Sequence, residues 1–268
     1  MSDTMKQIVL ASRPDGAPTP ENFRLEEHPV PTPAEGEVLV RVHYMSLDPY
    51  MRGRMDDAKS YAANIPVDGK MEGGSVGEII ASNAAGFEVG QFVMGGFGWA
   101  THAVADAKTL AKIDPNTAPI TYALGVLGMP GLTGWYGLTE LGKPKEGETL
   151  VVAAATGPVG SMVGQIAKSR GLRTVGIAGG PDKCKMAVEH FGFDVCLDHK
   201  AYATASELRA AIKEAAPKGI DIYFENVGGK VLEAVIPLMN QFGRIPVCGM
   251  ISWYNFVFND TEATEKGL

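Results

Sequence analysis

The chain has 268 residues, of which 45% are hydrophobic and 21% charged, the ordinary composition of a globular protein with one large or two modest cores. Its formal net charge of -7 would repel a phosphate backbone and therefore argues against a nucleic-acid partner. The three cysteines, Cys184, Cys196 and Cys248, form no Cys-x-x-Cys pair, which argues against a disulfide framework or a cysteine-rich zinc lobe.

The N-terminal residues 1–7 are polar and charged where a signal peptide needs an apolar run. No stretch approaches the length of a membrane-spanning helix. We therefore expect a cytoplasmic protein without a membrane partner.

The first part of the chain is rich in predicted strands. Every second residue over 38–44 is Val or Tyr, which is the period of a β-strand. Further short strands are predicted over residues 8–11, 77–81, 91–94 and 100–105. Because clusters of Gly and Pro separate them, we predict a barrel-like or sandwich-like β domain over residues 1–125.

The pattern changes near residue 120, where two helical segments are predicted over residues 122–127 and 132–141. From residue 148 onward strands and helices alternate, which requires a parallel sheet because each crossover returns the chain to the same edge. The predicted strands cover residues 149–154, 173–178, 194–198, 220–225 and 244–248. We therefore predict an α/β protein whose residues 126–268 form a doubly wound Rossmann domain, with five strands where a complete sheet has six.

A glycine-rich loop follows the first of these strands and opens a helix. Its sequence, A-T-G-P-V-G over residues 155–160, is a G-x-G-x-x-G fingerprint with Ala155 in the first position. Gly157 allows the backbone to approach a pyrophosphate, and Gly160 allows the helix to pack on the strand. The strand and helix around the loop favour nucleotide binding over a merely structural turn.

The end of the second strand discriminates between the two nicotinamide coenzymes. An NAD enzyme places an acid there for the ribose 2′-hydroxyl, but this strand ends in Gly179 and Gly180. Asp182 comes later, at a helix start, where we expect it to cap the helix. Lys183 can reach a 2′-phosphate, although it could also be a solvated surface lysine. The pattern favours NADPH.

Five segments carry a family resemblance. They are L-D-P-Y-M-R-G-R-M over 47–55, G-M-P-G-L-T over 128–133, A-A-T-G-P-V-G-S over 154–161, Y-F-E-N-V-G-G over 223–229 and C-G-M-I-S-W-Y-N over 248–255. On these segments the chain resembles the zinc-independent medium-chain dehydrogenase/reductases, and within them the prostaglandin reductase, curcumin reductase and alkenal double-bond reductase group. The resemblance implies a GroES-like catalytic domain before the Rossmann domain.

Three departures from the family pattern accompany the resemblance. Trp253 stands where the family often has a small polar residue, and Asp198-His199-Lys200 replaces a segment that usually carries a tyrosine near the 2′-phosphate. His199 and Lys200 could take over the role of that tyrosine. The family's chain also continues past this C-terminus, so we expect a truncated sheet. Relatives often pair the missing sixth strand across a homodimer, which leaves dimerisation open here.

The glycine loop, the strand ends and the resemblance together indicate a set of coenzyme-binding residues. Asn226, Gly228 and Gly249 follow strand ends, where open sheets bind ligands, and are expected to flank the nicotinamide. The complete set comprises Pro130, Thr133, Thr156, Gly157, Pro158, Val159, Gly160, Gly179, Gly180, Lys183, His199, Asn226, Gly228, Cys248 and Gly249.

No metal site is expected. Zinc alcohol dehydrogenases of the superfamily carry a His-Glu pair where this chain has Met71-Glu72, and the first half contains no cysteine. Without a Lewis acid, the accessible reaction is hydride transfer to the β-carbon of an enone or enal, with a hydrogen-bond donor at the carbonyl oxygen. The resemblance points to Tyr254 and Tyr50 as pocket hydroxyls, with Tyr61 behind them. Core packing is the alternative for each tyrosine.

Two further functions remain open at this point. A quinone reductase of the same superfamily would share the coenzyme site and differ in its acceptor. A catalytically inactive NADPH-binding protein would follow from a truncated sheet, whose cleft could be open to water. NADPH-dependent reduction of an apolar, small-molecule enone or enal is the function that the residues favour.

Overall fold

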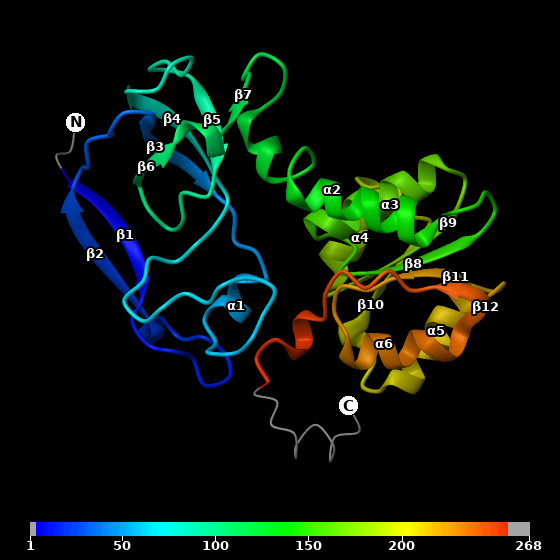
Figure 1. Cartoon of the computed structure of the whole chain (residues 1–268). Coiled ribbons are helices and arrows are strands. Elements are labelled where there is room, and N and C mark those ends of the chain that lie inside the picture. Colours follow the sequence, from blue (N-terminus) through cyan, green and yellow to red (C-terminus); the bar gives the residue numbers. More distant parts are fainter. Residues whose placement is uncertain (1–3, 257–268) are drawn as a thin grey trace. The chain divides into compact units, whose positions relative to one another are not determined.

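The computed structural model describes residues 4–256 of the chain. These residues divide into two compact units. The first comprises the described residues up to Leu124 together with residues 254–256, and the second comprises Gly125–Trp253 (Figure 1). No described helix has both the length and the apolar character that crossing a membrane requires.

The first unit is built on a five-stranded antiparallel sheet in the order β6-β3-β4-β5-β7. Its strands are β3 (Glu37–Met45), β4 (Ser75–Ser82), β5 (Phe92–Gly95), β6 (His102–Asp106) and β7 (Ala111–Ile113). Val38 and Val40 on β3 are fully buried and pack with Ile79, Val93 and Phe97. The period of two seen in the sequence therefore places these valines in the core of the unit.

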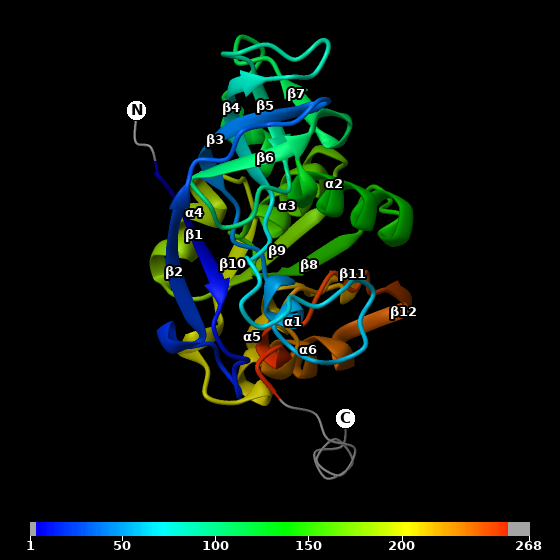
Figure 2. The same cartoon turned by 60° about the vertical axis from the view of Figure 1, so that its left-hand side comes forward.

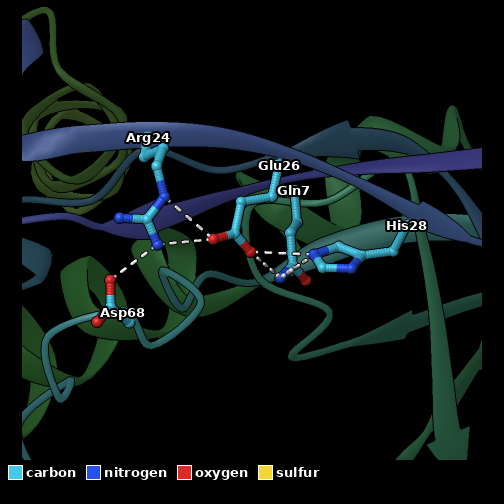
Figure 3. Close-up of polar contacts among 5 residues, drawn as sticks. All are labelled: Gln7, Arg24, Glu26, His28 and Asp68. Carbon is cyan, nitrogen blue, oxygen red and sulfur yellow. Dashed lines mark hydrogen bonds and ion pairs between the residues drawn. The ribbon is translucent and has the colours of Figure 1, made fainter.

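A second, two-stranded sheet pairs β1 (Thr4–Leu10) with β2 (Phe23–Pro29), and Figure 2 shows the two strands side by side. No strand was predicted at β2, because its sequence F-R-L-E-E-H-P is charged on both faces and lacks apolar alternation. Polar side chains stabilise it instead: Arg24 donates to Glu26 and to Asp68, each at 2.7 Å (Figure 3). Arg24, His28 and Gln7 together lower the pKa of Glu26 to about 2.

A short helix, α1 (Met51–Arg54), lies in the same unit beside a separate small core. This core contains Leu10, Met55, Ile65 and Met71, and Met71 is fully buried in it. Met71, which stands where zinc alcohol dehydrogenases of the superfamily were expected to carry a histidine, is thus a packed apolar side chain.

The second unit is a five-stranded parallel sheet in the order β10-β9-β8-β11-β12. Its strands are β8 (Thr149–Ala153), β9 (Arg173–Ala178), β10 (Val195–Asp198), β11 (Ile220–Phe224) and β12 (Met239–Arg244). Its helices are α2 (Met129–Tyr136), α3 (Pro158–Ser169), α4 (Pro181–Glu189), α5 (Ala205–Ala215) and α6 (Gly229–Val235). The order reverses direction at β8, as a doubly wound sheet requires.

Helices cover both faces of this sheet, with α3 and α4 on one side and α5 and α6 on the other (Figure 1). Successive residues of β8 serve the two cores: Leu150 packs with Val163 of α3, while Val151 packs with Leu208 of α5. The fold class predicted from the sequence, a β-rich domain followed by a Rossmann-like parallel sheet, is confirmed.

The fifth strand lies earlier in the chain than residues 244–248, where it was predicted. It is β12, and the preceding helix ends at Val235. The predicted segment still lies beside β11, since Arg244 pairs with Ile222 and Val247 forms an isolated parallel bridge with Glu225. Pro246 lacks the N–H that a continuous ladder needs. The pattern of β12 was hidden because its sequence, M-N-Q-F-G-R, is polar and Phe242 is exposed with φ +61°.

Candidate functional site

The β8–α3 turn is shaped by its glycines and by one strained alanine. Ala154 has φ +53°, a left-handed conformation that L-residues other than glycine rarely adopt. The N–H of Gly157 donates to the Ala154 carbonyl at 2.9 Å and closes the turn. A Cβ on Gly160 would lie 2.3 Å from the same carbonyl oxygen, so no other residue fits there without moving the backbone. The predicted strand–turn–helix context of the loop is therefore present.

This turn leaves backbone donors uncovered. Helix α3 has Gly157 as its N-cap without a side-chain cap, Pro158 in its first turn and no acidic residue there. Within residues 4–256 no acceptor takes the N–H of Val159 or Gly160. Thr156 is half-buried and lies within the turn that the Gly157 N–H and the Ala154 carbonyl close. Free N–H groups and the positive end of the helix dipole are the features with which helices bind phosphate.

Helix α2 packs across the start of α3 and carries two of the predicted coenzyme residues. A Cβ on Gly134 would lie 3.2 Å from the carbonyl oxygen of Val159, which shows how closely the helices approach. Pro130 is buried in the first turn of α2, and the Thr133 hydroxyl donates to the Met129 carbonyl at 2.7 Å. Both residues therefore lie on the helix next to the glycine loop.

The end of β9 is bordered by basic side chains. A Cβ on Gly179 would lie 3.1 Å from Nε2 of His199 and 3.2 Å from Cε of Lys200. Gly180 has φ +103° and is the N-cap of α4, so Asp182 does not cap the helix as predicted; it lies exposed in the first turn beside Lys183. Glycine adopts the positive φ of position 180 without steric cost, whereas the backbone of an aspartate would be strained there.

The Asp198 carboxylate accepts hydrogen bonds from two backbone N–H groups. It accepts the N–H of Gly180 at 2.8 Å and the N–H of Lys200 at 2.9 Å. These two hydrogen bonds lower the pKa of Asp198. Asp198 therefore ties the ends of β9 and β10 together.

Lys230, which the sequence did not single out, holds the turn that carries His199. Its Nζ donates to the carbonyls of His199 at 2.9 Å and Tyr202 at 2.5 Å. Burial, and then the charge of Lys230, lower the pKa of His199. A lysine at the start of α6, 31 residues away in the chain, gives no local signal for this contact.

The β11–α6 turn is organised by a second residue that sequence reasoning missed, the fully buried Glu225. Its carboxylate accepts the N–H of Val227 at 2.5 Å, the N–H of Gly228 at 2.9 Å and the hydroxyl of Tyr223 at 2.9 Å. Burial, and then the Glu225 charge, raise the pKa of Tyr223 far above its usual range. An acid directly after a buried strand was the available signal.

The other residues predicted to flank the nicotinamide surround this turn. The Asn226 side chain donates to the Ala153 carbonyl at 2.8 Å, which connects the ends of β11 and β8. The N–H groups of Cys248 and Gly249 donate to the Glu225 carbonyl at 2.9 and 3.3 Å. Asn226, Gly228, Cys248 and Gly249 thus gather at the carboxyl end of the sheet, where doubly wound folds bind ligands.

In the first unit, the rings of two predicted catalytic tyrosines, Tyr50 and Tyr61, both lie next to the guanidinium of Arg54. The Cζ atom of Arg54 lies 5.6 Å from the ring centre of Tyr50 and 4.4 Å from that of Tyr61. Burial, followed by the charges of Glu72 and Asp48, raises the pKa of Tyr50, while Arg54 opposes that rise. Tyr50 therefore stays protonated at neutral pH and can donate a hydrogen bond.

The third predicted tyrosine, Tyr254, is half-buried at the start of the segment 254–256 of this unit. A Cβ on Gly16 would lie 3.8 Å from the carbonyl oxygen of the following Asn255. Among residues 4–256 no group of three or more His, Cys, Asp or Glu side chains is arranged to hold a metal ion.

Two family models match the chain. One, described as the N-terminal domain of oxidoreductase, matches residues 6–113, and the other, described as zinc-binding dehydrogenase, matches residues 158–268. The chain is 56% identical over 250 residues to the NADPH-dependent curcumin reductase of Escherichia coli, covering 93% of this chain and 71% of that protein. It is 40% identical to the NADP(+)-dependent 2-alkenal reductase of Nicotiana tabacum, over 93% of this chain and 74% of that protein.

A solved structure shows the same fold. The crystal structure of CurA from Vibrio vulnificus in complex with NADPH superposes with a TM-score of 0.89 at 52% identity. The match covers 98% of this chain and 78% of that one.

Proposed function

This chain belongs to the medium-chain dehydrogenase/reductase family, in the group of the curcumin, prostaglandin and 2-alkenal reductases, and from that premise we propose that it uses NADPH to reduce the carbon–carbon double bond of α,β-unsaturated aldehydes and ketones. The observation that carries the proposal is the pairing of free N–H groups on the β8–α3 turn with the basic side chains at the end of β9, where the one adjoining carboxylate, Asp198, already accepts two backbone N–H groups. The group's members named as NADPH-dependent or NADP(+)-dependent reductases support it.

The residues at the carboxyl end of the sheet fit this coenzyme. The uncovered N–H groups of Val159 and Gly160 would hold the pyrophosphate, because they have no other acceptor in the described part of the chain. His199, Lys200 and Lys183 would surround the 2′-phosphate, since the space over Gly179 is bordered by two of these side chains. Asn226, Gly228, Cys248 and Gly249 would flank the nicotinamide, and Pro130 and Thr133 would border it from α2.

When bound, NADPH supplies the hydride that such a reduction needs. The chain's own task is then to hold the carbonyl group of the substrate and stabilise the negative charge that develops on its oxygen. A tyrosine hydroxyl suits this task because it donates a hydrogen bond without ionising near neutral pH. We assign the donor role to Tyr50 and Tyr254, with Tyr61 supporting them, and a proton from solvent completes the saturated product.

The experiment is an NADPH-oxidation assay with a panel of 2-alkenals and enones, in which mass spectrometry identifies the product. We expect products that gain two hydrogens across the double bond and keep their carbonyl group. Saturated aldehydes serve as the control and are expected to give no turnover. A quinone tested in parallel separates this activity from quinone reduction.

A panel without turnover, measured on protein that calorimetry shows to bind NADPH, would exclude the double-bond reductase. Reduction of the carbonyl group itself would equally contradict the proposal.

A further inference from the structure

Arg54 is a buried cation at the end of α1. Its side chain is only 5% exposed, and its Nε lies 2.7 Å from Oε1 of Glu72. That contact is an ion pair and not an aligned hydrogen bond, since Oε1 accepts no hydrogen bond from the described residues. One terminal nitrogen donates to the Ala62 carbonyl at 3.1 Å. A charge removed from water to this extent requires compensation, so its partners are informative.

The two tyrosine rings are among those partners. The guanidinium lies over the rings of Tyr50 and Tyr61, within the distance at which a cation is attracted to a ring face. Neither hydroxyl has a hydrogen-bond partner within residues 4–256. A contact through the ring face leaves the hydroxyl at the ring edge free to donate to another molecule.

Tyr61 shows why such a contact is needed. It is 85% exposed, so the core of the unit does not hold its ring. Arg54 closes the loop around it with both its side chain and its backbone: the Ala62 carbonyl accepts from the guanidinium, and the Arg54 carbonyl accepts the N–H of Ile65 at 2.8 Å. The orientation of Tyr61 therefore depends on Arg54.

A second buried arginine on the same helix provides a contrast. Arg52 is 8% exposed and pairs with Asp56 at 2.5 Å and with the Gly16 carbonyl at 2.9 Å. Among the described residues it lies over no aromatic ring. Arg52 thus has the same burial, charge and helix as Arg54 without the tyrosines.

We propose that Arg54 is a positioning residue for the substrate site, which holds the rings of Tyr50 and Tyr61 so that their hydroxyls point toward the carbonyl oxygen of a bound enone. The inference rests on the proposed function, since that function assigns the hydroxyls to the substrate. Arg54 touches neither substrate nor coenzyme in this scheme. Its charge also favours the hydrogen-bond donor strength of Tyr50, because it opposes the carboxylates around that hydroxyl.

The test compares Arg54→Met with the matched variant Arg52→Met. We expect Arg54→Met to lower kcat for a 2-alkenal by about 10- to 100-fold, because a displaced donor costs transition-state stabilisation. The Kd for NADPH, measured by calorimetry, is expected to stay within about twofold, since the coenzyme residues lie in the other unit. Arg52→Met is expected to keep kcat within about threefold of the unchanged protein.

A conservative variant and a spectroscopic readout keep the test decisive. Arg54→Lys retains the charge without the planar guanidinium, so we expect it to recover part of kcat. If Arg54→Met does not fold, Arg54→Lys carries the test, with a fall in kcat and not a rise in KM as the expected result. NMR of ¹³C-labelled tyrosine is expected to show a higher pKa for Tyr50 in Arg54→Met and no change in Arg52→Met.

Equal losses of kcat in the two methionine variants, or a Tyr50 resonance that titrates as before, would overturn the assignment to Arg54. Absence of turnover in the unchanged protein would instead contradict the proposed function. The NMR titration does not depend on turnover and would still decide the contact between Arg54 and Tyr50.

Discussion

Two strand-to-helix turns of the same parallel sheet differ in whether their backbone N–H groups have a hydrogen-bond acceptor. The β8–α3 turn leaves the N–H groups of Val159 and Gly160 without an acceptor in the described structure. The β11–α6 turn gives the N–H groups of Val227 and Gly228 to the buried carboxylate of Glu225. Both turns lie at the carboxyl end of the sheet, so position alone does not make an anion site. The difference lies in whether the protein itself supplies the negative charge.

The largest expected effect comes from removing that internal carboxylate. Glu225→Ala would leave two buried N–H groups and the Tyr223 hydroxyl without an acceptor, and we expect a loss of about 3 kcal/mol in the free energy of unfolding. Glu225→Gln keeps an acceptor oxygen and is expected to cost about 1 kcal/mol. Urea unfolding measures both variants. If Glu225→Ala were as stable as Glu225→Gln, the carboxylate would not organise the turn.

The next largest effect is expected on NADPH affinity, from a substitution in the β8–α3 turn. Gly160→Ala would place a Cβ 2.3 Å from the Ala154 carbonyl oxygen and force α3 away from β8. We expect the affinity for NADPH to fall by about 100-fold, because the free N–H groups move with the helix. Gly96→Ala in the first unit is the control, since a Cβ there would meet nothing within 4 Å. Calorimetric titrations showing equal affinities for the two variants would contradict this view of the turn.

A smaller effect is expected at the coenzyme's second phosphate. Lys183→Glu replaces a cation beside Gly180 with an anion, and we expect about 10-fold weaker NADPH binding from the changed charge. NADH lacks the 2′-phosphate, so its affinity is expected to change by less than about twofold. Fluorescence titration with each coenzyme measures both values. Equal losses for the two coenzymes would show that Lys183 does not contact the 2′-phosphate.

Lys230→Met tests whether a residue of α6, which begins beside the proposed nicotinamide site, also supports the proposed 2′-phosphate site at His199. The variant keeps the aliphatic stem and removes the amine that holds the carbonyls of His199 and Tyr202. We expect NADPH affinity to fall by about fivefold, because the turn beside Gly179 becomes mobile while its basic side chains remain. Lys200→Met is the comparison, since it removes a charge next to Gly179 without loosening the turn. Hydrogen exchange over residues 199–202 is expected to increase only in Lys230→Met.

The smallest effect is a dependence of stability on pH. The folded pKa of His199 is lowered, so the unfolded chain binds the proton more readily. This residue therefore contributes stability above its unfolded pKa near 6.5, and that contribution is lost as the pH falls through the lower folded pKa. Urea unfolding between pH 8 and pH 5 is expected to show a shallower decline for His199→Gln, and an identical decline would contradict the expectation.

The sequence was a good guide where the pattern is local. The strands β8, β9 and β11 are short, mostly apolar and mostly buried. The loop at Gly157 and Gly160 was predicted because it connects such a strand to a helix. The sequence was a poor guide at β2 and β12. Both strands have polar sequences and lie at the edge of their sheets, so neither carries the apolar pattern of a buried strand.

The amino-acid sequence by itself determined the alternation of strands and helices in the second unit and the place of the phosphate loop, because periodicity and glycine conformation act over a few neighbouring residues. Only the tertiary structure decided which donors are satisfied and which rings share a cation. Asn226 reaches Ala153 across 73 residues, and Lys230 reaches His199 across 31. Such contacts depend on packing between distant segments, which residue spacing along the chain does not encode.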